Sequence, residues 1–121
     1  VNIKKALNNV YKNQTNVDDY LIESIRKPSL DPGAFNVFKS VFNPAGVQGE
    51  PFDKLFKKLE SPVLLLWGGK DPWMNTDSKR LLYKKYAPEN TKEVILDAGH
   101  CPHDEVPELV NQHILDWIDS L

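Results

Sequence analysis

The chain has 121 residues, of which 26% are charged and 40% hydrophobic, a composition that excludes a disordered tail and a membrane protein. Fifteen basic and seventeen acidic side chains give a formal charge of -2, so electrostatics give no reason to expect nucleic acid or an anionic membrane as a partner. No apolar run approaches the roughly 18 residues of a membrane span. A single cysteine, Cys101, excludes an internal disulfide and a cysteine-rich zinc site.

The N-terminus of the chain does not begin with methionine. The first residue is Val1 and the only methionine is Met74, so we expect a chain that has been processed, cut or excerpted from a longer one. No signal-peptide pattern is present at Val1, which leaves the compartment undetermined.

Residues 1–60 are expected to form helices only. Apolar residues recur at helical spacing around 3–11 and 17–25, and Pro28 ends the second run. Asp31 and Pro32 predict an N-cap and first turn for a helix that carries Phe35, Phe38 and Phe42 on one face. We interpret that stripe as the buried face of the helix. The segment 43–51 predicts a loop, and a short amphipathic piece follows at 52–59.

Residues 61–121 have a different pattern. An unbroken apolar run at 63–67 predicts a strand buried on both faces, followed by a helix over about 77–86, a short strand at 94–96 and a last helix from Pro107. Strand, helix, strand, helix predicts parallel pairing in an α/β fold. Two parallel strands need strand neighbours, so we expect the end of a larger sheet, with the helices of 1–60 inserted over it.

Polar side chains follow both predicted strands. Asp71 lies in the loop after the first strand, and His100 lies in the loop after the second. Open α/β sheets place their ligands at the carboxyl ends of their strands. A carboxylate there would orient the imidazole and leave its second nitrogen free as a base. Taken singly, each residue is also compatible with ordinary turn chemistry.

Taken together, these features resemble the C-terminal portion of the α/β-hydrolase family. The resemblance covers 62–121, and the helices of 1–60 match the family's lid insertion by position and character. It implies that Asp71 is the triad acid and His100 the triad base. The sequence from Ala98 to Glu108 is similar to the histidine loop of plastid and cyanobacterial pheophytinase-like hydrolases, which implies a plastid-like or cytoplasmic location.

The family's third catalytic residue is not found in this sequence. The nucleophile of the family lies on a Gly-x-Ser-x-Gly elbow before the lid, and none of the six serines here has a glycine neighbour. We therefore expect the missing N-terminal half of the same protein to supply the nucleophile, and this chain alone to be inactive. Cys101 and a metal site around His103 are disfavoured as substitutes, and no cofactor is expected.

Two aromatic residues are candidates for binding substrate. Trp73 follows the acid loop at the mouth of the expected site, and Phe38 belongs to the apolar stripe of the expected lid. Either could wall a pocket for a small apolar ester.

The function predicted from the resemblance is serine-type ester hydrolysis by the intact protein. An upstream aspartate in place of serine would instead give an epoxide hydrolase or dehalogenase, and Asp71 and His100 serve both mechanisms. A degenerate hydrolase fold acting as a binding module is a second class of function. A third is an independent small domain that dimerises through its open strand edge.

Overall fold

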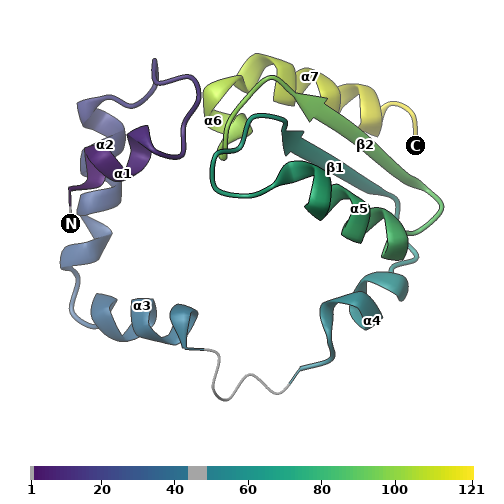
Figure 1. Ribbon diagram of the computed structural model, residues 1–121, viewed down its shortest axis with the longest axis horizontal. Helices are drawn as coiled ribbons and strands as arrows, with labels where there is room; N and C mark the ends of the chain where they lie inside the picture. Colours follow the sequence, from purple (N-terminus) through teal and green to yellow (C-terminus); the bar gives the residue numbers. More distant parts are fainter. Residues whose placement is uncertain (1, 44–48) are drawn as a thin grey trace.

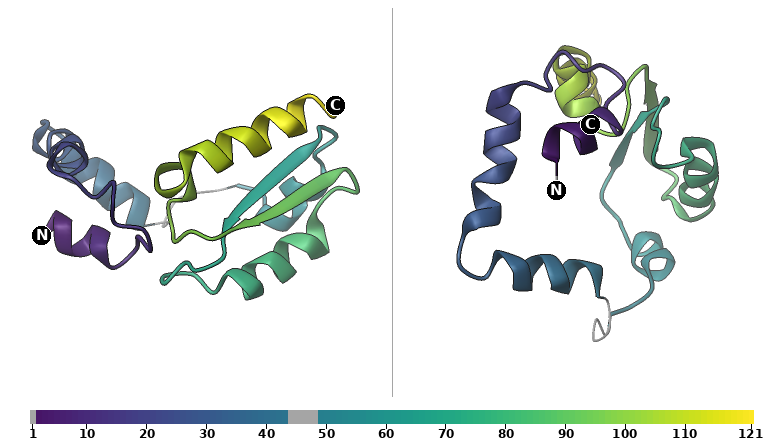
Figure 2. Two further views of the ribbon diagram at one scale, coloured as in Figure 1. Left: turned by 90° about the horizontal axis from the view of Figure 1, so that it is seen from above. Right: turned by 60° about the vertical axis from the view of Figure 1, so that its left-hand side comes forward.

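The computed structural model describes residues 2–43 and 49–121. In the described part, a two-stranded parallel sheet has helices on both of its faces, and further helices extend away from it (Figures 1 and 2). The described helices are α1 Ile3–Asn8, α2 Asp19–Arg26, η1 Pro28–Leu30 (a 3-10 turn), α3 Ala34–Phe42, α4 Phe52–Lys57, α5 Thr76–Tyr86, α6 Pro102–Glu105 and α7 Pro107–Ile118. The strands are β1 Val63–Gly68 and β2 Thr91–Leu96.

The predicted parallel pairing is confirmed. The two strands pair in register from Val63 beside Thr91 to Gly68 beside Leu96. The second strand is longer than the predicted 94–96, and several of its side chains are exposed rather than buried, Ile95 being half exposed. One of the additional strand residues is Glu93, which forms an ion pair with Arg80 on α5 through two hydrogen bonds of 2.8 and 2.9 Å.

The side chains of β1 alternate between two helical layers, as the pleat of a strand requires. Leu66 packs on the cluster of Leu96, Ala98 and Val110, which joins the sheet to α7. The next residue, Trp67, points to the opposite face, where its ring lies 5.2 Å from that of Tyr83 on α5. Helices α5 and α7 therefore cover opposite faces of the sheet (Figure 2).

The helices of 3–42 lie to one side of the sheet. Val10, Tyr11 and Val17 form a small core of their own, with Cys101 packed against it. Val10 and Tyr11 follow the end of α1 instead of belonging to it, although their spacing predicts a helix. Helix α3 lies away from the sheet (Figure 1 and the right panel of Figure 2).

Two predictions about α3 are wrong. Its N-cap is Gly33, with φ of 89°, and Asp31 and Pro32 lie before the helix, because Pro28–Leu30 forms a separate 3-10 turn. The aromatic stripe is not a buried face, since Phe35, Phe38 and Phe42 are 74%, 62% and 71% exposed. The expected loop at 43–51 lies partly outside the described residues.

Gly68 ends β1 at a point where no side chain fits. A Cβ at this position would lie 1.7 Å from the carbonyl oxygen of Gly99 and 3.0 Å from that of Ala98. Both are backbone atoms, so neither can move without displacing the loop that follows β2. The two loops after the strands therefore approach each other through bare backbone.

Gly68→Ala is expected to lower the free energy of unfolding by about 3 kcal/mol or more, because the clash involves backbone on both sides. Gly49→Ala is the matched control, since a Cβ there meets nothing within 4 Å. Urea unfolding of the two variants measures the difference. A G68A protein as stable as G49A would contradict the close approach.

Candidate active site

Asp71 and His100 lie side by side at the carboxyl ends of the two strands. The imidazole Nδ1 and the carboxylate Oδ2 are 2.8 Å apart. Because a carboxylate oxygen only accepts, Nδ1 carries the proton and donates it in this hydrogen bond. The side chain of Asp71 is 10% exposed and that of His100 is 31% exposed. The acid is therefore shielded, while the base remains open to solvent on one side.

The second oxygen of Asp71 folds the loop around it. Oδ1 accepts hydrogen bonds from the backbone N–H of Trp73 at 2.7 Å and of Met74 at 3.0 Å. This is the turn chemistry typical of aspartate. One oxygen of Asp71 is thus hydrogen-bonded to the imidazole, and the other is hydrogen-bonded to the turn. The turn bonds fix the direction in which the other oxygen points.

The hydrogen bonds to Asp71 also determine its charge. Partial burial raises the pKa of Asp71, but the hydrogen bonds from His100, Met74 and Trp73 outweigh that effect. The pKa of this carboxyl consequently lies below its usual value. Asp71 is therefore ionised at neutral pH and can stabilise a protonated imidazole.

The backbone of His100 is held from the N-terminal part of the chain. Its N–H donates to the carbonyl oxygen of Val10 at 2.9 Å. No described residue is hydrogen-bonded to Nε2, the other ring nitrogen, which leaves it free to act as a base. The ring of Trp73 stands edge-on to the imidazole, with 5.2 Å between ring centroids.

A small cavity of about 160 Å³ adjoins this pair. It is lined by Leu66, Trp67, Gly68, Asp71, Met74, Thr76, Lys79, His100 and Pro102. Substrate pockets for small molecules commonly measure about 300–1,000 Å³. The cavity is therefore large enough for a reacting group but not for a whole bulky ester.

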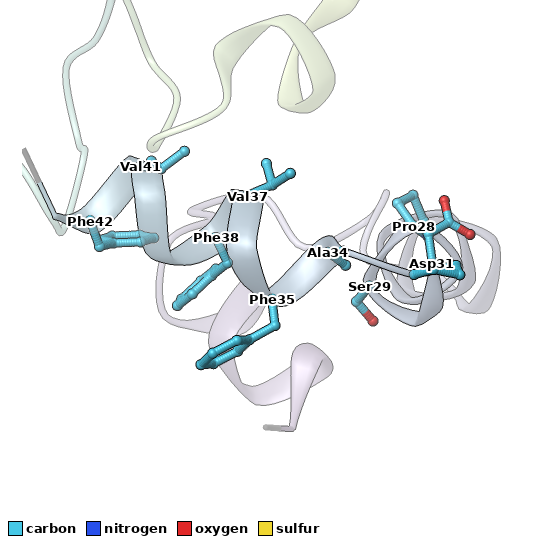
Figure 3. Close-up of a pocket in the computed structure, with 11 residues that line it drawn as sticks. Pro28, Ser29, Asp31, Ala34, Phe35, Val37, Phe38, Val41 and Phe42 are labelled. Carbon is cyan, nitrogen blue, oxygen red and sulfur yellow. The ribbon is translucent and has the colours of Figure 1, made fainter. Parts of the chain in front are cut away.

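Phe38 is not brought to this pair. It lines a separate, open apolar hollow of about 780 Å³ along α3, together with Phe35, Val37, Val41 and Phe42. Figure 3 shows the three phenylalanines leaving the helix on one side, and Val37 and Val41 leaving it on the other. Among the predicted site residues, Trp73 thus contacts His100, whereas Phe38 lies in a different part of the molecule.

Cys101 has no sign of an activated thiol. Burial raises its pKa, and the carboxylates of Glu105 and Asp104 raise it further, against a hydrogen bond with Tyr11 that lowers it. A reactive cysteine needs the opposite environment, because the thiolate is the nucleophile. Within the described part of the chain, no three His, Cys, Asp or Glu side chains are grouped to hold a metal ion.

Sequence reasoning missed one residue beside the site. Glu105 is a buried carboxylate, 3% exposed, that accepts hydrogen bonds from the loop carrying His100. A sequence pattern gives little signal for it, because its partners are backbone groups and some of them lie more than 90 residues away.

Comparisons with known proteins identify the family of this chain. The family model for the alpha/beta hydrolase fold matches residues 13–107, so the chain belongs to that family. It is 32% identical over 121 residues to a chloroplastic pheophytinase of Arabidopsis thaliana, covering 98% of this chain and 25% of the relative. It is 27% identical over 116 residues to YugF, an uncharacterised hydrolase of Bacillus subtilis strain 168, covering 96% and 41% respectively.

The chain therefore spans between a quarter and about two fifths of the length of these relatives. No solved structure matches it. In the ranges 2–43 and 49–121, no helix is both long and apolar enough to span a bilayer.

Asp71→Asn tests the charge on the acid. Because the pKa of Asp71 is lowered by folding, its ionised form stabilises the native state above the unfolded pKa of about 3.9. We expect D71N to lower the free energy of unfolding by about 1–3 kcal/mol at pH 7. That difference should shrink as the pH falls below 4, through the lowered pKa of the folded state.

Urea unfolding at several pH values between 2 and 7 measures this difference. Asp119→Asn, at an exposed position beyond α7, shows the general effect of removing one negative charge. A difference between D71N and the unmodified protein that stays constant over this pH range would contradict the assignment.

Proposed function

We propose that this chain supplies the acid and the base of a Ser-Asp-His triad in a carboxylic-ester hydrolase. The observation that supports it is the 2.8 Å hydrogen bond from His100 Nδ1 to Asp71, with Nε2 free, at the carboxyl ends of parallel strands. Membership of the hydrolase family agrees with this assignment. The serine would come from a part of the protein N-terminal to Val1, since the family places its nucleophile before the lid.

The proposed reaction has two steps. The serine hydroxyl attacks the ester carbonyl as Nε2 of His100 takes its proton, and the imidazolium then gives that proton to the departing alcohol. In the second step, His100 removes a proton from water, the resulting hydroxide attacks the acyl-enzyme and releases the acid, and the imidazolium returns its proton to the departing serine oxygen. Asp71 stabilises the imidazolium in both steps, because its lowered pKa keeps it ionised.

The proposed substrate is an ester with a bulky apolar part. The name of the relative that is 32% identical, a pheophytinase, designates an enzyme that acts on pheophytin, and this supports the proposal of an apolar substrate. The ring of Trp73 stands against the imidazole, with 5.2 Å between centroids, and would contact the substrate there. Phe38 lines the separate hollow along α3, not the cavity beside His100. It could bind the same substrate only if that substrate extended from His100 to this hollow.

A different nucleophile defines the second candidate function. An aspartate at the upstream position would attack an epoxide or an alkyl halide, and His100 would then activate water against the resulting ester. Asp71 and His100 would keep the same roles. The fluorophosphonate experiment below distinguishes the two, because that reagent labels an activated serine and not an aspartate.

His100→Ala is expected to lower kcat for a p-nitrophenyl ester by about 10³-fold or more, because it removes the only base of the proposed triad. The measurement uses the full-length protein that carries this chain. His103→Ala is the matched control, since His103 lies three residues further along the chain, in α6, and is exposed. Activity of H100A within a few-fold of H103A would refute the role of His100.

Labelling with a fluorophosphonate, followed by mass spectrometry of the labelled peptide, is expected to identify a serine N-terminal to Val1. H100A should label far more slowly than H103A, because the serine then lacks its base. Ester hydrolysis without a labelled serine would exclude the serine mechanism. A protein that neither hydrolyses esters nor reacts with the probe would leave the aspartate mechanism and a binding module, and turnover of an epoxide or alkyl halide would separate these two.

A further inference from the structure

Glu105 is an unusual residue for its environment. Among the described residues, Glu105 is the one polar or charged residue that is buried, with an exposure of 3%. A buried carboxylate is costly unless hydrogen bonds replace the lost water. No ion pair is found for Glu105 among the described residues, and its side chain accepts hydrogen bonds from backbone N–H groups. Such an arrangement requires an explanation beyond packing.

The four donors come from two places in the sequence. Oε2 accepts from the N–H of Lys12 at 3.0 Å, of Asn13 at 2.8 Å and of Gly99 at 3.0 Å. Oε1 accepts from the N–H of Cys101 at 3.3 Å. One carboxylate thus joins the segment after α1 to the loop that carries His100.

His100 lies between the two loop residues that Glu105 holds. The N–H groups of Gly99 and Cys101 donate to Glu105, and the N–H of His100 itself donates to Val10. Three successive backbone N–H groups are therefore fixed. The loop has no free space either, because a Cβ on Gly99 would lie 2.6 Å from the nitrogen of Lys12 and 2.7 Å from Oε1 of Glu105.

We propose that Glu105 is a positioning residue for His100: by tying residues 10–13 to the loop 99–101, it holds the imidazole against Asp71. This inference rests on the proposed function, in which His100 is the base. Glu105 does not touch the imidazole in any hydrogen bond of the described structure and acts through the backbone on either side of it.

A second contact joins the same two segments and serves as a comparison. The hydroxyl of Tyr11 donates to Oδ2 of Asp104 at 2.8 Å. This bond links the segment after α1 to α6 without involving the N–H groups of Gly99 or Cys101. Tyr11→Phe therefore removes this link, together with the contact of its hydroxyl with the Cys101 thiol, but leaves the backbone N–H groups of Gly99 and Cys101 bound to Glu105.

Two substitutions of Glu105 separate charge from hydrogen bonding. Glu105→Gln can keep its carbonyl oxygen on Lys12, Asn13 and Gly99, but its amide then faces the N–H of Cys101, donor against donor. Glu105→Ala leaves all four N–H groups without an acceptor. We expect kcat to fall about 10²-fold in E105A and about 10-fold in E105Q, with KM within about threefold, because a base displaced by about 1 Å loses that much.

Two control variants make comparable changes elsewhere in the chain. Glu108→Gln makes the same change at an exposed position on α7, and we expect kcat within about twofold of the unmodified protein. Tyr11→Phe should also stay within about threefold. A loss in Y11F as large as that in E105A would mean that any link between the segments suffices, and would overturn the specific role of Glu105.

A spectroscopic readout makes the test independent of the catalytic proposal. The Nδ1 proton of His100, hydrogen-bonded to a carboxylate, is expected to give a downfield proton NMR signal that D71N and H100A abolish. E105A and E105Q should broaden or lose that signal, whereas E108Q and Y11F should keep it. If H100A proves active, the proposed function fails, and the NMR signal still decides whether Glu105 positions the ring.

E105A leaves four N–H groups unpaired, so E105Q decides the outcome if E105A does not fold. An E105Q protein that is folded, keeps the Nδ1 signal unchanged and retains kcat within twofold overturns the proposal. Loss of the signal with KM preserved supports it.

Discussion

The close approach of the two loops at the carboxyl ends of β1 and β2 is the constraint on which the site depends. Gly68 brings bare backbone against Gly99, and two hydrogen bonds lock the contact, from Gly69 N–H to Leu96 at 2.8 Å and from Lys70 N–H to Ala98 at 2.9 Å. The ladder of the parallel sheet therefore continues past the last strand residues. Asp71 follows directly after this contact, and His100 follows on the other side.

This contact explains how the two loops hold Asp71 and His100 in a fixed relative geometry. Asp71 has one oxygen committed to the turn of its own loop and one to the imidazole, so neither is free to rotate away. Outside the pair, Lys12 and Lys70 both bind Asp97, which lowers the pKa of that exposed carboxyl to about 2. Lys12 and Lys70 are thus paired with Asp97, and Asp71 is the carboxylate hydrogen-bonded to His100.

Much of this site could be predicted from the sequence, because the signals are local. β1 is a short apolar run that ends at Gly68, and the apolar residues 94–96 end β2. Asp71 and His100 each come within four residues of the end of the strand before them. Parallel pairing then brings Asp71 and His100 together without any further information. The same logic places Trp73 beside the imidazole, since it follows Asp71 by two residues.

The features that could not be predicted depend on distant contacts. Glu105 accepts from Lys12 and Asn13, which lie more than 90 residues away and contribute only backbone. Val10 and Tyr11 continue the helical spacing of α1 but leave the helix to reach the histidine loop. For Phe35, Phe38 and Phe42, periodicity correctly predicts one face of a helix, yet it cannot say whether a partner surface lies against that face.

Under the proposed function, this chain supplies the groups for proton transfer, while much of the substrate pocket comes from the rest of the protein. Proton transfer requires a base in a fixed tautomer and an ionised acid beside it, and residues within this chain provide both. Substrate binding requires a pocket several times larger than the 160 Å³ beside His100, and the apolar hollow along α3 is separate from it. Exposed apolar side chains on α3, α5 and β2, such as Phe35, Leu81 and Ile95, are the kind of surface that another part of a protein covers. Under the proposed function, the acid–base chemistry is therefore determined here, while the choice of substrate depends on surfaces that close over these apolar faces.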